Sequence, residues 1–135
     1  MFLVRDAFNM IRQITDQGLV IGLWGALLNI PQFIGGIAFI DSIEGKVVLV
    51  LSIGTLMVAG QMHRHKPFSR LIGLCHLPWL VMLPWLVFRL AGHDYSPLHG
   101  YWIHYVVGVV AISLIFDTAD IVRYIRGDKS FSWVK

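Results

Sequence analysis

Ionisable side chains inside long apolar runs are the residues of this sequence that could do chemistry, because such positions are rare and each needs a partner. The last apolar run, residues 100–122, ends with Asp117 and Asp120, which are three residues apart and share one helix face. His76 lies in the preceding run, at a depth similar to that of Asp117. A histidine–carboxylate pair in a low-dielectric surrounding titrates near neutral pH. Two interpretations stay open for this pair: a hydrogen-bonded lock between two helices, or a proton-relay or ion site.

Two arginines are further candidate partners of these carboxylates. Asp120 is three residues before Arg123, so we expect an ion pair between them on one helix. For Asp117, Arg70 is the alternative partner to His76.

Polar amides form a second group of candidates. Asn29 and Gln32 flank Pro31 within the first apolar run, near the expected middle of the membrane, where proline should kink the helix. Amides at such depth usually hydrogen-bond to a neighbouring helix. The alternative is contact with a substrate or an ion at a broken helix.

Histidines are the candidate ligands for a cofactor. His93, His99 and His104 follow one another near Asp94, and such a set suits zinc, copper or iron, although their spacing matches no known metal motif. His63 and His65 lie in a basic stretch. Haem or a transition metal therefore stays open as a cofactor. His76 and His104 are predicted at opposite leaflets, so they cannot share one haem.

The composition indicates which kind of secondary structure carries these residues. Hydrophobic residues make up 56% of the 135-residue chain and charged residues only 14%, whereas a soluble domain carries about 25% charge. We therefore predict an all-α integral membrane protein, a single bundle over residues 1–135. An amphipathic helix over residues 1–17, which lies at the membrane interface or forms a short cap on the bundle, precedes four transmembrane helices. Each of these has roughly the ~20 residues that a bilayer requires. These helices are expected at residues 19–40, 47–62, 71–91 and 100–122, followed by a basic tail, residues 123–135.

The third predicted helix has an unusual sequence. Pro78 and Pro84 should distort it, and Trp79 and Trp85 beside them are expected to pack in the core or against lipid. The single cysteine, Cys75, is expected to be a small core residue.

The distribution of basic residues predicts the orientation. They concentrate in the N-terminal segment, in residues 62–70 and in the tail, while the other two loops hold few. The positive-inside rule then places both termini in the cytoplasm of a protein of the inner (plasma) membrane. The net charge of +3 is accordingly attributed to topology and not to nucleic-acid binding.

The sequence contains no phosphate-binding loop, zinc-protease helix or serine nucleophile elbow. The expected function is therefore a non-enzymatic subunit: an accessory, assembly or scaffold component of a larger membrane complex, or of a homo-oligomer. Its expected partners are the lipid bilayer and other membrane subunits or further copies of itself. The alternative is an ion, proton or small-solute conductor, or a redox subunit that binds haem or metal.

Overall fold

The computed structural model describes residues 1–131, which form six helices and no β-strand. Residues 132–135 of the predicted tail, including Lys135, lie outside the described residues. The prediction of an all-α fold is confirmed for the described part of the chain. The helices are α1 (Phe2–Thr15), α2 (Leu19–Ala38), α3 (Ile43–His65), the 3-10 helix η1 (Arg70–His76), α4 (Trp79–Gly92) and α5 (Pro97–Ile125).

Three of these helices, α2, α3 and α5, are each long and apolar enough to cross a membrane. The segment made of η1 and α4 is a fourth candidate, although its two helices meet at a bend of 43°. Length and composition thus support three spans, or four if the bent segment is one broken span.

The bend corrects the prediction of one continuous helix over residues 71–91. Pro78 has no backbone N–H and cannot donate to the carbonyl of Leu74, as an α-helix requires. That carbonyl accepts instead from the N–H of Leu77 at 3.2 Å, which is the spacing of a 3-10 helix. The chain re-enters an α-helix at Trp79 in a new direction.

Helix α3 is longer than the predicted segment 47–62. It begins at Ile43 because the side chain of Ser42 caps it, accepting from the N–H of Gly45 at 3.0 Å. Residues 43–46 and 63–65 at its two ends are helical, although their polar side chains had suggested that they lie in loops. Helix α5 likewise exceeds residues 100–122, because it starts at Pro97, a residue suited to the first turn of a helix. Helix α2 runs without interruption through Pro31.

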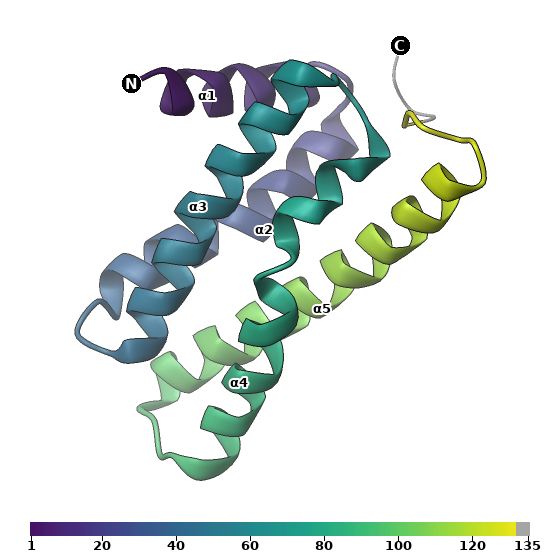
Figure 1. Cartoon of the computed structure of the whole chain (residues 1–135). Coiled ribbons are helices and arrows are strands. Elements are labelled where there is room, and N and C mark those ends of the chain that lie inside the picture. The colour runs from purple at the N-terminus through teal and green to yellow at the C-terminus, as the bar shows by residue number, and fades with distance from the viewer. Residues whose placement is uncertain (132–135) are drawn as a thin grey trace.

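Helices α2 and α3, the η1–α4 segment and α5 run in alternating directions between two ends of the molecule (Figure 1). At the first, here called the α1 end, lie α1, residues 66–69 and the C-terminal end of α5. At the second, the hairpin end, lie residues 39–42 and 93–96, which connect α2 to α3 and α4 to α5. Helix α1 lies across the α1 end, beside α3 (Figure 1).

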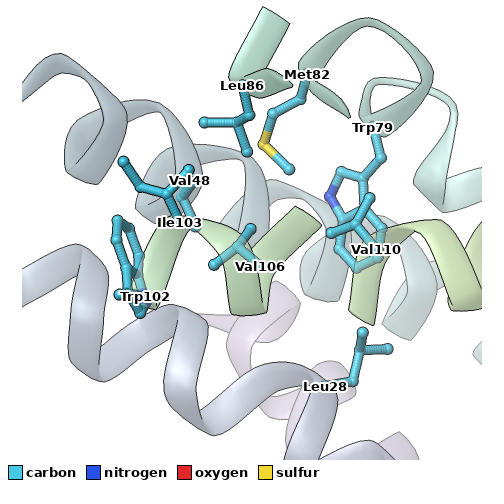
Figure 2. Packing of buried hydrophobic residues seen from close by; sticks show 9 residues of the cluster. All are labelled: Leu28, Val48, Trp79, Met82, Leu86, Trp102, Ile103, Val106 and Val110. Carbon is cyan, nitrogen blue, oxygen red and sulfur yellow. The ribbon is translucent and has the colours of Figure 1, made fainter. Parts of the chain in front are cut away.

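Buried apolar side chains from α2, α3, α4 and α5 form the main core between the two ends (Figure 2). Trp79 is completely buried in it, and Trp85 packs against its edge, which agrees with the predicted packing roles of both residues. Cys75 is also buried, as expected of a small core residue. The core consists of Leu28, Val48, Trp79, Met82, Leu86, Trp102, Ile103, Val106 and Val110.

Candidate functional site

The structure brings His76 and Asp117 into contact, as the sequence suggested. Nδ1 of His76 lies 2.6 Å from Oδ2 of Asp117, and each side chain is 15% exposed. Gly73 makes this approach possible, because a Cβ atom there would lie 2.7 Å from Oδ1 of Asp117. The His76 ring also stacks on Trp79, with ring centroids 4.0 Å apart. The histidine is therefore held between a carboxylate of α5 and the first residue of α4.

Asp120 does not form the expected pair with Arg123. Its partner is Arg70, whose Nη1 lies 2.7 Å from Oδ1 of Asp120. The same guanidinium reaches Asp128 through Nη2 at 2.9 Å, and the Arg70 side chain is only 3% exposed. The prediction was wrong because η1 places a nearly buried cation beside the end of α5, where it competes with the exposed Arg123. Arg70 thus fastens η1 to α5 and to the residues that follow it.

The two amides of α2 behave differently. Gln32 is fully buried, and its Oε1 accepts from the hydroxyl of Ser52 at 3.1 Å, which links α2 to α3. The expected hydrogen bond to a neighbouring helix is therefore present for Gln32. Asn29 donates to the carbonyl of Gly25 at 2.8 Å on its own helix, and it lines an apolar cavity of about 550 Å³ between α1, α2 and α3.

Two aromatic side chains of α5 bind the backbone of α2 around Pro31. Because Pro31 has no N–H, the carbonyl of Leu27 loses its helical donor. The hydroxyl of Tyr105 donates to that carbonyl, and Nε1 of Trp102 donates to the carbonyl of Pro31 at 2.9 Å. This contact was not predicted from the sequence. Its only signal was Pro31 itself, which identifies a free carbonyl four residues earlier.

A buried carboxylate at the hairpin end was also missed. Glu44 is almost fully buried, and its Oε1 accepts from Nε of Arg89 at 2.6 Å and from the hydroxyl of Tyr95 at 2.7 Å. Burial, together with the hydrogen bond given to Glu44, raises the pKa of Tyr95 above its ordinary value. This cluster joins the start of α3 to the end of α4 and to the loop after it. Glu44 lies between the predicted helices 19–40 and 47–62, so its role was not expected from the sequence.

Helix α1 is attached to α3 by a further carboxylate. Oδ2 of Asp6 accepts from Nε2 of Gln61 and from Nη1 of Arg64, both at 2.9 Å. The amide of Gln61 in particular, with the charge of Arg64, lowers the pKa of Asp6. Gly60 allows the two helices to touch, since a Cβ atom there would lie 2.7 Å from the backbone nitrogen of Ala7.

The histidines of the hairpin end do not assemble a ligand set. The ring of His99 stacks on Phe39 at 4.3 Å, and Nδ1 of His104 lies 2.7 Å from the carbonyl of Gly100 on its own helix. His93 lies beside Tyr95. Within residues 1–131, no three His, Cys, Asp or Glu side chains are grouped so that they could hold a metal ion.

At the α1 end, His63 has a structural role. The N–H of Phe68 donates to Nδ1 of His63 at 3.3 Å, so Nε2 carries the proton and donates to Gln13 at 2.8 Å. Both ring nitrogens are thus engaged, which leaves neither free to bind a metal. His65 is exposed.

Most of these polar contacts join two elements of one bundle, whereas those of Asn29 and His104 stay within one helix. Comparison with protein-family models, with curated proteins and with solved structures finds no match to this chain.

Proposed function

We propose that this protein is a non-enzymatic subunit of the inner (plasma) membrane, built as a four-span bundle with both termini in the cytoplasm. The observation that carries this proposal is that the carboxylates located in helices pair with residues of other elements. Each of the four carboxylates that lie inside helices bonds to a partner on another element. Such pairing is what a helix bundle needs in order to hold its own helices together. The carboxylates are Asp6, Glu44, Asp117 and Asp120.

The four-span topology is supported by the path of the chain and by its charge. The basic segments predicted to be cytoplasmic, at the N-terminus, in residues 62–70 and after α5, gather at the α1 end. The loops with few basic residues gather at the hairpin end. A bundle that spans the membrane with the α1 end inside satisfies the positive-inside rule at every connection.

The position of the apolar core argues against conduction through a single bundle. The bonds of Arg70 and His76 to Asp120 and Asp117 join η1 to the C-terminal half of α5, and the Glu44 cluster joins the start of α3 to the end of α4. Between them, Val48, Ile103 and the other core residues fill the interior (Figure 2). A solute path would have to cross this apolar layer.

The outer face of α5 is a surface for lipid or for another subunit. Large apolar side chains stand exposed along this helix, among them Ile112, Ile115, Phe116 and Ile125. In a membrane such a face is compatible with partners as well as with acyl chains, and a scaffold or accessory role uses it for contact.

Flux measurements and purification together test the proposal. Liposomes containing the purified protein should be impermeable to protons and ions across a pH range. The tagged protein should retain a stoichiometric membrane partner or further copies of itself after mild solubilisation.

Asp117→Asn should lower the unfolding temperature, because it weakens the bond to His76. Thr118→Val should not, because Thr118 bonds only to its own helix.

The alternative function, proton or ion conduction, is favoured by one observation: the partly exposed pair of His76 and Asp117. A pH-dependent current that is lost in Asp117→Asn and kept in Thr118→Val would support conduction and overturn the subunit proposal.

A further inference from the structure

An apolar groove of about 440 Å³ lies at the α1 end, between α1, α3 and η1. Its walls come from Leu3, Met57, Val58, Met62, Leu71 and Ile72. The remaining lining residues are polar or basic: Gln61, His65, Lys66 and Ser69. No carboxylate lines the groove.

The polarity of the groove changes with position along α3. Lys66 and His65 lie at the C-terminal end of this helix, while Met57 lies about 13 Å further along its axis, at ~1.5 Å per residue. His65 and Lys66 thus lie at one end of the groove, whose walls are apolar along their whole length. A phospholipid has the matching form, with a polar headgroup at one end of long acyl chains.

The basic residues of the groove are available to a ligand. Their neighbours Arg64 and Arg70 are bonded to carboxylates of the protein. The side chains of Lys66 and His65 are exposed, and neither is bonded to any other side chain within residues 1–131. Ser69 accepts from the N–H of Leu71 through its Oγ, so its hydroxyl proton is free to be donated.

We propose that this groove binds one anionic phospholipid of the cytoplasmic leaflet. The headgroup phosphate lies against Lys66, His65 and Ser69, and an acyl chain lies along Met57, Val58 and Ile72. A net negative headgroup is selected because Lys66 is exposed at one end of an otherwise apolar groove that no carboxylate lines. The inference rests on the membrane placement in the proposed function and is independent of the subunit role.

The test measures phospholipid retention on the purified full chain. The detergent-solubilised protein is titrated with phosphatidylglycerol or with phosphatidylcholine, and bound lipid is counted by native mass spectrometry while the unfolding temperature is followed. One phosphatidylglycerol should be retained and should raise the unfolding temperature, whereas phosphatidylcholine should bind several-fold more weakly.

Matched variants locate the site. Lys66→Gln should weaken phosphatidylglycerol binding about fivefold, the effect of one basic residue near a headgroup. Lys46→Gln, which changes an exposed lysine at the hairpin end of the same helix, should leave binding unchanged. Val58→Trp fills the groove from a half-exposed position and should reduce the binding of both lipids.

Three results would overturn the inference: equal retention of the two lipids, equal effects of Lys66→Gln and Lys46→Gln, or a dimer that closes the groove and excludes lipid. Because the measurement needs neither a partner protein nor a flux, its failure is distinct from failure of the subunit proposal.

Discussion

Several polar side chains inside this bundle complete a hydrogen bond that the apolar surroundings would otherwise leave open, although the buried Nε1 of Trp79 has no such partner among the described residues. Tyr105 shows the principle most simply, because its hydroxyl supplies the donor that Pro31 removes from Leu27. Glu44 shows it for a charge, since Arg89 and Tyr95 both donate to a single buried oxygen. At this scale the sequence identifies the residues that need partners and leaves the choice among partners open.

A contact could be predicted only where a residue that needs a partner has few partners to choose from. A pair between His76 and Asp117 was predicted because the two residues lie at similar depths on consecutive apolar segments. Few other polar side chains lie at that depth. Asp120 was assigned to Arg123 because they are close in sequence, but Arg70 reaches it through the tertiary fold. Such contacts over long sequence distances depend on the order of helices around the bundle, which no residue pattern specifies.

The contact between Tyr105 and Leu27 can be tested by a double-mutant cycle. Tyr105→Phe should destabilise the protein by about 1 kcal/mol, because the carbonyl freed by Pro31 loses its donor. In a Pro31→Ala background the alanine N–H serves that carbonyl, so Tyr105→Phe should cost little. Unfolding in detergent measures both values, and Tyr101→Phe on the exposed face is the control. Equal costs in the two backgrounds would contradict the assignment.

The cluster around Glu44 predicts a dependence on alkaline pH. The pKa of Tyr95 is raised in the folded protein, so its contribution to stability is fully present below the unfolded value near 10 and is lost as the pH rises through the folded value. At pH 8, Tyr95→Phe should cost about 1.5 kcal/mol. The difference from the unmodified protein should shrink above pH 10 in unfolding experiments. A difference that stays constant up to pH 11, as expected for Tyr101→Phe, would show that the raised pKa is not linked to stability.

At the scale of elements, two interruptions of regular structure determine the shape. Pro78 ends the 3-10 helix η1 and redirects the chain into α4, and this bend turns Arg70 and His76 toward α5. The sequence predicted distortion here but not its form, since a proline can kink a helix or end it. Helix ends were misplaced at α3 for a related reason: capping by Ser42 and burial of Glu44 keep polar residues helical.

Helix α1 is predicted to depend on one glycine of α3. Gly60→Ala places a Cβ atom against the backbone of Ala7, and relief of that overlap should cost about 1–3 kcal/mol and lift α1 from α3. Hydrogen exchange in α1 should then rise, while exchange in α5 should not change. Gly54→Ala is the matched control, because a Cβ atom at Gly54 meets nothing within 4 Å. Unchanged protection of α1 in Gly60→Ala would show that this contact does not hold the helix.

At the scale of the whole molecule, hydropathy was sufficient to predict an all-α chain with long apolar helices, because apolar length is a local property of the sequence. The same property does not set the number of spans, since the bend between η1 and α4 fits either one broken span or a segment that enters and leaves on one side. Charge distribution and the two polar ends of the bundle favour the broken span, with the α1 end in the cytoplasm.

The most direct test of this architecture is cysteine labelling from each side of the membrane with an impermeant maleimide. Cys75→Ala removes the native thiol, and single cysteines are then introduced as Asp41→Cys, Lys66→Cys, His93→Cys and Arg126→Cys. We predict labelling of positions 66 and 126 only from the cytoplasmic side, and of positions 41 and 93 only from the opposite side. Labelling of positions 66 and 93 from the same side would make residues 70–92 a re-entrant segment and would contradict the four-span bundle.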